Sequence, residues 1–287
     1  GKELRGTQSV TRSRLMGVIS GLTKEVAPAI YGALNKIIQK ARDMGFGDKI
    51  YYHSTTAKKD FDEFSDVGTG SNDLGYHFGT AQAADERNRN LVNNKLRDLF
   101  NESPERFKKL NMNYEKMGEG SRTFPVKLKA NNPLYLEENR TGEWKSRDIL
   151  KQIEKKIDSD LSSNNTFGNM TEKEMEDFLS GDYKLNNVIR DDAIDYKVES
   201  DKYMGEDWGI NEWTKDFLEK NGFDSIKYTN IVEDAGSESV IVLRPNQIRM
   251  PWASFDPEKA KSGNLLASAA PVAVSLGALS ELKEEPQ

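Results

Sequence analysis

The chain has 287 residues, of which 36% are hydrophobic and 31% charged, and it carries a formal net charge of −6 at pH 7. The absence of cysteine excludes disulfides, thiolate nucleophiles and zinc–thiolate sites. The acidic balance gives no strong signal of nucleic-acid binding, because phosphate backbones are bound by clustered Lys and Arg. We predict no metal site, since two histidines are too few for most histidine-rich centres, although carboxylates alone could bind Mg²⁺.

Residues 1–48 are predicted to form a helical arm. Apolar side chains recur at helical spacing on both sides of Pro28, which is expected to kink or divide the helix. Glycines at positions 45 and 47 predict its end. The arm is interpreted either as a helical hairpin packed on the next domain or as a surface for a partner or for assembly.

Short strands and helices follow residue 48, and residues 49–260 are predicted to form the main domain. Short apolar runs predict strands, and apolar residues at helical spacing predict helices. Strands are expected at 49–54, 76–79, 124–129, 225–229 and 239–243, and helices at 81–100, 144–161 and 211–220, with one helical turn at 61–64.

Two segments differ in composition from the rest of the chain. Residues 162–207 are rich in Asn, Asp, Ser and Glu, and we predict a polar surface insertion with one short helix at 172–179. Residues 261–287 are predicted to form an apolar C-terminal tail with a charged end. Its apolar part, 265–279, is shorter than the roughly 20 residues that span a bilayer, so we expect it to dock on its own domain or to contact a membrane or another subunit.

Both histidines lie within residues 51–80, each at the end of a predicted strand. A histidine flanked by aromatic residues on a strand is most often half-buried and hydrogen-bonded. His53 and His77 are, however, followed by small or polar residues, and a glycine-rich segment at 68–71 lies between them. Strand ends and glycine-rich loops are common places for ligand contacts, so the pair is predicted to bind a ligand.

The sequence around the two histidines resembles the ADP-ribosyltransferase fold, a split antiparallel β-sheet shared by poly-ADP-ribose polymerases and related toxins. In that family the first strand ends in His, then Gly or Ser, then Ser or Thr, and residues 53–55 match this order. A helix with an aromatic residue follows, matched by 61–64, and then a Gly-aromatic-x-Phe strand, matched by 75–78. The resemblance implies an α+β fold with a split antiparallel core, preceded here by the helical arm. The His-His pair is similar to the branch that includes the tRNA 2′-phosphotransferases.

Three later motifs resemble the ADP-ribosyltransferase-like domain found in large polyvalent proteins of bacteriophages and mobile elements. A strand running into Asn-Pro-Leu is matched by residues 126–134. A Gly-Phe/Tyr-Asp-x-Ile-x-Tyr strand is matched by 222–228, and a Ser-x-Ile-Val-x-x-Pro-x-Gln-Ile strand by 239–248. Each motif is weak alone, but together they occur in the family's order and the resemblance covers about residues 50–257.

The resemblance implies that NAD is the substrate, and it assigns roles to the residues of the first two motifs. His53 would hydrogen-bond the adenosine ribose, and His77 occupies the position of the Tyr that stacks on nicotinamide in polymerase-type members. The residues implied to bind NAD are Tyr52, His53, Ser54, Thr55, Gly75, Tyr76, His77 and Phe78.

The final strand departs from the family pattern. Protein-modifying transferases place there a Glu that stabilises the oxocarbenium-like transition state as nicotinamide leaves. Alignment on the Gln-Ile pair at 247–248 puts Ser239 at that position, with Glu238 one residue earlier and on the opposite face unless a bulge re-aims it. Arg244 and Arg249 are either exposed charges or ligands for a phosphate. The catalytic candidates are His53, His77, Glu238 and Ser239.

Two main functions are expected from these features. The first is an NAD-dependent ADP-ribosyltransferase, phage-encoded, that transfers ADP-ribose to a host macromolecule such as a host protein. The second is a catalytically inactive virion protein, internal or ejected, whose partners are other virion proteins. Either protein would be found in the virion, in the host cytoplasm or in both. A nucleic-acid 2′-phosphate transferase is a third alternative, disfavoured by the acidic net charge.

Overall fold

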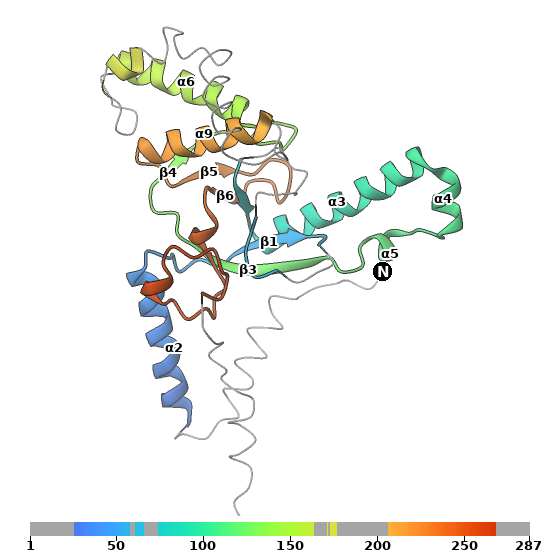
Figure 1. The fold of residues 1–287 in the computed structure, drawn as a ribbon, viewed down its shortest axis with the longest axis horizontal. Helices are drawn as coiled ribbons and strands as arrows, with labels where there is room; N and C mark the ends of the chain where they lie inside the picture. The colour runs from blue at the N-terminus through green and yellow to red at the C-terminus, as the bar shows by residue number, and fades with distance from the viewer. Residues whose placement is uncertain are drawn as a thin grey trace, which may run out of the picture.

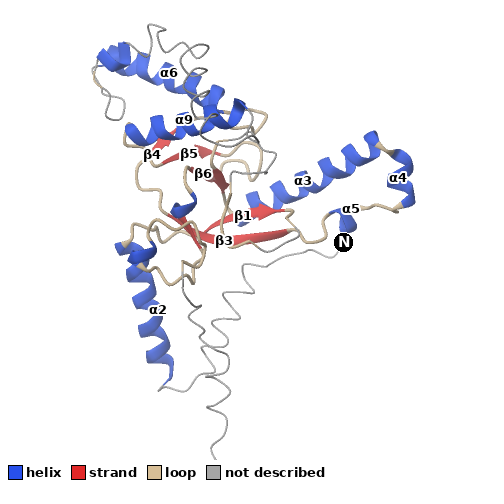
Figure 2. Ribbon diagram, viewed as in Figure 1, coloured by secondary structure: helices blue, strands red, loops and turns tan. Residues whose placement is uncertain are grey.

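The computed structural model describes residues 26–57, 61–65, 74–163, 171, 173–176 and 206–267. The described chain folds into two small β-sheets with helices around them, which confirms the predicted α+β class (Figure 1). The strands lie at the centre of the molecule, and two helical projections leave this body in different directions (Figure 2).

The strands of the first sheet are β1 (Tyr51–Thr55), β3 (Arg122–Leu128) and β7 (Ile248–Arg249). Their order is β1-β3-β7, and both pairs are antiparallel. β1 pairs with β3 along its whole length, whereas β7 pairs with the end of β3. Aromatic and β-branched residues are frequent in β1 and β3 and favour an extended, half-buried surface.

The second sheet contains β2 (Tyr76–Phe78), β4 (Pro133–Tyr135), β5 (Ser225–Thr229) and β6 (Glu238–Val242), in the order β2-β6-β5-β4. β4 runs parallel to β5, so this half of the core is mixed and not wholly antiparallel as expected. The carboxylate of Asp224, just before β5, accepts hydrogen bonds from the backbone N–H groups of Asn131 and Asn132, just before β4. This contact holds the starts of the two strands together, which makes the pair parallel.

The two sheets are joined where β1 meets β2. The N–H of Tyr52 donates to the carbonyl of Gly79 at 2.9 Å, and the N–H of Gly79 donates to the carbonyl of Tyr52 at 3.1 Å. A side chain at position 79 would crowd this junction, because an added Cβ would lie 3.0 Å from both the Ala83 Cβ and the Ser239 Oγ. The split core therefore places the strand of one histidine directly beside the strand of the other.

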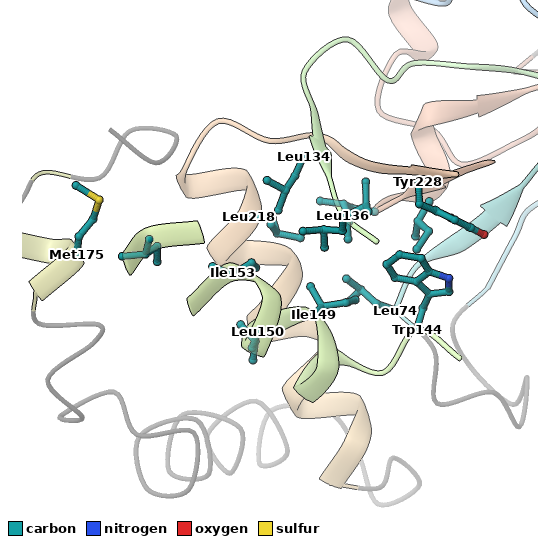
Figure 3. Packing of buried hydrophobic residues seen from close by; sticks show 14 residues of the cluster. Leu74, Leu134, Leu136, Trp144, Ile149, Leu150, Ile153, Met175, Leu218 and Tyr228 are labelled. Atoms are coloured by element: carbon teal, nitrogen blue, oxygen red, sulfur yellow. The ribbon is translucent and has the colours of Figure 1, made fainter. Parts of the chain in front are cut away.

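α6 (Ser146–Ser163) and α9 (Glu206–Lys220) pack together over the second sheet and enclose a hydrophobic cluster with it (Figure 3). α6 buries one face because its apolar residues recur at helical spacing. Each fully buried aliphatic side chain contributes about 1.5–3 kcal/mol to stability. The cluster comprises Leu74, Leu134, Leu136, Trp144, Ile149, Leu150, Ile153, Ile157, Met175, Leu218, Ile226, Tyr228, Ile241 and Leu243.

A second hydrophobic cluster is built from side chains of both sheets, and a third holds α2 (Val26–Asp43) to the body. In the third cluster Phe46, just after α2, packs edge-on against Phe255 with ring centroids 5.3 Å apart. Two short 3₁₀ turns, η1 (Pro245–Gln247) and η2 (Pro257–Lys259), lie in the segment after β6. The second cluster comprises Tyr51, Phe64, Tyr76, Phe78, Val126, Leu128, Val240, Val242, Ile248, Met250 and Leu265.

A helical projection is formed by α3 (Ala81–Glu102), α4 (Pro104–Lys109) and α5 (Tyr114–Met117), which we call the α3–α5 arm. α3 begins at Thr80, whose side-chain oxygen accepts a hydrogen bond from the N–H of Ala83. The buried residues of α3 all lie at or before Val92, so its second half leaves the body and carries the two short helices (Figure 1). The sequence predicts α3 but gave no indication of α4 and α5.

The remaining predictions have mixed outcomes. The helical arm expected at 1–48 contains α2, while residues 1–25 lie outside the described part of the chain. The helical turn expected at 61–64 is wrong, because Glu63 instead forms an isolated bridge with Asn264. Tertiary pairing with the C-terminal segment has here overridden the local pattern.

The polar insertion and the tail are described in part. Within the predicted insertion at 162–207, a helix at 173–176 places Met175, which is 2% exposed, in the first cluster, so this helical turn packs on the core. The N–H of Leu265 donates to the carbonyl of Asp62 at 2.6 Å, which docks the start of the tail on its own domain. Residues 268–287 lie outside the described residues, and none of the helices described is long and apolar enough to cross a membrane.

Candidate functional site

His53 lies on β1 at the junction of the two sheets. Its Nδ1 is 2.9 Å from the backbone oxygen of His77. A carbonyl oxygen can only accept, so Nδ1 carries the proton and Nε2 is the acceptor nitrogen of the neutral ring. The ring is half-buried, and its centroid lies 4.9 Å from that of Phe64 and 5.5 Å from that of Phe78.

The surroundings of His53 keep its imidazole neutral. Burial lowers the pKa of the ring, the hydrogen bond to the His77 carbonyl raises it, and the charge of Arg87 lowers it, with a net shift below the ordinary value of 6.5. At neutral pH the ring therefore offers Nε2 as an acceptor, which suits a hydroxyl donor such as that of a ribose.

His53 is predicted to make the fold sensitive to acid. A base whose pKa is lowered by folding binds more protons in the unfolded chain, so the free energy of unfolding falls as the pH drops below 6.5. The loss should reach about 1.4 kcal/mol per pH unit until the pKa of the folded state is passed. Urea unfolding between pH 5 and 7 should show that the free energy of unfolding depends more steeply on pH for the wild type than for His53→Phe. Equal pH dependence in the two proteins would contradict the lowered pKa of His53.

The ring of His77 lies on the other face of the junction. His77 and Phe78 are neighbours on β2, and successive strand residues point to opposite faces. Phe78 shares the face of His53, so the ring of His77 does not, and its Nε2 lies 3.1 Å from the backbone oxygen of Leu74 instead. The structure thus brings His53 to the backbone of His77, while the two rings lie on opposite faces.

The other β1 residues predicted to bind NAD differ in exposure. Ser54 is buried, and its Oγ is hydrogen-bonded to the Oγ1 of Thr123 at 2.8 Å. Thr55 is half-buried, and its Oγ1 accepts from the N–H of Ala57 at 3.1 Å while keeping a proton that it can donate. Tyr52 is also half-buried. Tyr52 and Thr55 are therefore more open to a ligand than Ser54.

The second motif contributes mainly to the core. Tyr76 and Phe78 are 6% and 2% exposed, and both belong to the second cluster. Gly75 has a φ of +64°, and an added Cβ would lie 2.5 Å from the carbonyl oxygen of Val242, so the turn into β2 requires glycine. These residues anchor the strand that carries His77.

Ser239, one of the two candidates on the final strand, is 2% exposed. Its Oγ accepts a hydrogen bond from the Nδ2 of Asn230 at 3.1 Å, and Ser239 lies directly opposite Tyr228 in the β5–β6 ladder. The same oxygen lies against Gly79, where the two sheets join. Internal partners therefore occupy this hydroxyl.

Glu238, the other candidate, lies on the opposite face from Ser239. The β5–β6 ladder is regular along its whole length, with no bulge to re-aim either residue. Oε1 of Glu238 accepts hydrogen bonds from Lys49 Nζ at 2.9 Å and from the Tyr51 hydroxyl at 2.8 Å. Oε2 lies 3.7 Å from Lys227 Nζ. The side chain is 40% exposed, and both of the short hydrogen bonds are made by Oε1, not by Oε2.

The carboxylate of Glu238 is held in its ionised form. Burial raises its pKa, but the hydrogen bonds from Lys49 and Tyr51 and the charges of Lys49 and Lys227 outweigh burial and bring the pKa below the ordinary value of 4.5. Burial and the neighbouring Glu238 raise the pKa of the Tyr51 phenol, which keeps it protonated as a donor. The site therefore offers a fixed negative charge at neutral pH.

His53 and Glu238 lie on the same side of the junction. Tyr51 and His53 are alternate residues of β1 and share one face, and Tyr51 reaches Glu238 directly. Sequence reasoning named His53 and Glu238 but missed Lys49 and Lys227. The alternation of Lys49, Tyr51 and His53 was the available signal, because it predicts one common face.

Both arginines after β6 make internal contacts. Arg244 forms ion pairs with three carboxylates of α9, and Arg249, which is 0% exposed, donates to three backbone carbonyls. These contacts hold the segment that follows β6, so the phosphate-binding role considered from the sequence is replaced by a structural one. The acceptors are Glu212, Asp216 and Glu219 for Arg244, and the carbonyls of Ile248, Lys259 and Ser262 for Arg249.

Within the described ranges, no group of three or more His, Asp and Glu side chains is placed to hold a metal ion. The functional groups of the site are the neutral imidazole of His53, the ionised carboxylate of Glu238, and the Lys49 and Tyr51 donors that bind this carboxylate. No family model, curated protein or solved structure matches the chain.

Proposed function

We propose that the chain is an NAD-dependent ADP-ribosyltransferase that modifies a host protein or another host macromolecule. The observation that carries the proposal is the placement of ionised Glu238 and neutral His53 on one side of the sheet junction. A carboxylate can stabilise positive charge that develops on a ribose, and a neutral imidazole can accept a hydrogen bond from a ribose hydroxyl. Together they suit a substrate that carries two riboses.

In the proposed reaction, the bond between C1′ of the nicotinamide ribose and the pyridinium nitrogen breaks. Its electron pair leaves with nicotinamide, which departs as a neutral molecule, and C1′ becomes electron-poor. A nucleophile of the acceptor forms the new bond to C1′ and gives up a proton to solvent. Glu238 would accept a hydrogen bond from the 2′-hydroxyl through Oε2 and stabilise the charge on the ribose. His53 would hold the adenosine ribose.

The arrangement of the strands supports the proposal as well. β1 carries His53 and is hydrogen-bonded to the end of β2, and β2 in turn pairs with β6, which carries Glu238. The motif on β6, which is far in sequence from the motifs on β1 and β2, is therefore their neighbour in space. The half-buried Thr55 shares the face of His53 on β1 and adds a hydroxyl for a ligand to contact, whereas Tyr52 lies on the opposite face of the strand.

Release of nicotinamide from NAD by the purified chain tests the proposal. Water can serve as the acceptor, so the assay needs no host target, and the products are ADP-ribose, nicotinamide and a proton. We expect release above that of a heat-denatured sample. If neither release nor NAD binding is found at millimolar NAD, the proposal is overturned.

A catalytically inactive virion protein is the second candidate, favoured by the α3–α5 arm. Phe100 and Leu110 on this arm are 49% and 46% exposed, and apolar side chains that form a contiguous exposed patch are typical of protein-binding surfaces. The partners would then be other virion proteins, and the chain would be an internal or ejected component of a phage particle. Stoichiometric copies in purified particles with no NAD turnover would favour this function, and turnover would exclude it.

A further inference from the structure

The two donors that hold Glu238 come from residues outside the transferase motifs. Lys49 Nζ and the Tyr51 hydroxyl both bind Oε1, at 2.9 Å and 2.8 Å. Lys49 Nζ also lies 4.5 Å from the centroid of the Tyr51 ring, so the two donors support one another. Tyr51 is 7% exposed, and its ring is fixed by the second cluster. The pair forms a cradle for one carboxylate oxygen, in which the buried Tyr51 is the fixed donor and Lys49, whose side chain is 51% exposed, is the outer one.

This cradle determines where the other oxygen lies. A Glu side chain has three rotatable bonds, and without partners its carboxylate samples several positions at a strand end. With Oε1 held by two donors, Oε2 is directed away from them, and its contact with Lys227 Nζ is long, at 3.7 Å. An oxygen placed in this way can accept a hydrogen bond from a ligand hydroxyl.

We propose that Lys49 and Tyr51 are positioning residues, which hold Oε1 of Glu238 so that Oε2 meets a ribose hydroxyl of NAD. This inference rests on the proposed transferase function. Neither residue touches the reacting atoms, and both act through the orientation of the carboxylate. Small displacements of a catalytic group cost large factors in rate, which is why such a cradle affects kcat.

A purely structural role for the same contacts has to be separated from this one. Tyr51 belongs to the first sheet and Glu238 to the second, so their hydrogen bond also links the two sheets. A link of that kind would affect unfolding but leave the pH dependence of catalysis unchanged. The titratable groups around the carboxylate are Lys49, Tyr51 and Lys227, with Tyr135 of β4 close to Tyr51.

The expected sign of the pH effect follows from these donors. Lys49 and Tyr51 lower the pKa of Glu238, so the loss of either should raise that pKa. The ionised carboxylate would then be lost at a higher pH as the solution is acidified. The acidic limb of the plot of kcat against pH should therefore move to higher pH in both variants.

The test is nicotinamide release from NAD by Lys49→Met, Lys49→Arg and Tyr51→Phe, measured across the acidic limb. For Lys49→Met and Tyr51→Phe we expect kcat to fall about tenfold, while KM for NAD changes less than about twofold. The acidic limb of the plot of kcat against pH should move to higher pH in both variants. Lys49→Arg keeps the charge and the donors, so it should restore most of kcat. Lys109→Met and Tyr114→Phe, exposed on the α3–α5 arm, are matched controls and should behave as the wild type.

Melting curves show whether each variant is folded, and the Lys49→Met and Lys49→Arg pair decides the question if Tyr51→Phe does not fold. Wild-type kcat and an unmoved acidic limb in folded Lys49→Met would overturn the positioning role. A loss of kcat without a change of the acidic limb, not restored by Lys49→Arg, would overturn it too. In both cases the activity of the wild type would still support the transferase. If the wild type releases no nicotinamide, the proposed function fails, and this inference fails with it.

Discussion

Glu238→Gln is expected to lower kcat for nicotinamide release about 10²–10³-fold while the affinity for NAD changes less than about threefold. Gln keeps the size of the side chain, and its oxygen can still accept from Lys49 and Tyr51. It lacks the negative charge, and its amide nitrogen cannot accept a hydrogen bond from a ribose hydroxyl. The substitution should therefore remove stabilisation of the transition state, which lowers kcat, and should change the stability of the enzyme–NAD complex much less.

The measurement for Glu238→Gln combines single-turnover release of nicotinamide with calorimetric titration of NAD. Glu115→Gln on α5, where the side chain is exposed, is the matched control for the loss of one carboxylate. It should keep both the rate and the affinity of the wild type. Wild-type turnover by Glu238→Gln would remove the carboxylate from the proposed mechanism.

Ile241→Ala should destabilise the fold by about 2–5 kcal/mol, because it leaves a cavity in a closely packed core. Ile241 is 0% exposed on β6, and its side chain belongs to the cluster beneath α6 and α9. The same strand begins with Glu238, so its packing also supports the candidate site. A loss of this size is a large part of the stability of an ordinary domain.

Ile231→Ala is the matched control, since it removes the same atoms from a side chain that is 48% exposed in the loop between β5 and β6. Its effect should stay within about 0.5 kcal/mol. Urea unfolding followed by circular dichroism measures both variants under the same conditions. Similar losses in the two variants would contradict the placement of Ile241 in the core.

Local patterns in the sequence were sufficient for most of the secondary structure. The strand expected at 225–229 is found with those bounds, and the long polar helix expected at 81–100 is α3. Apolar spacing predicts such elements because it reflects burial of one face. The turn at 61–64 is wrong because a distant residue fixes this segment: Asn264 forms a bridge with Glu63 and donates a hydrogen bond to the carboxylate of Asp62, 202 residues away.

The contacts of the candidate site depend on tertiary structure more than the secondary-structure elements do. Lys49 and Glu238 are 189 residues apart, and no local pattern links them. The sequence placed Glu238 and Ser239 on opposite faces but could not show which face holds His53. That depends on the pairing of β1 with β2 at Tyr52 and Gly79, a contact made by backbone atoms and therefore independent of side-chain type.

The central claim is that the junction holding His53 and Glu238 binds NAD and releases nicotinamide. Calorimetric titration of NAD into the wild type and into His53→Phe, with released nicotinamide measured in the same samples, tests it most directly. His53→Phe keeps a ring against Phe64 and Phe78 but removes the acceptor nitrogen, and melting curves report whether it is folded.

Our account predicts that the wild type binds NAD and releases nicotinamide. It also predicts that folded His53→Phe binds NAD at least about tenfold more weakly. Equal binding by the two proteins would show that NAD, if bound, is held elsewhere. If the wild type shows neither binding nor release at millimolar NAD, the claim is contradicted, and the inactive virion protein becomes the working function.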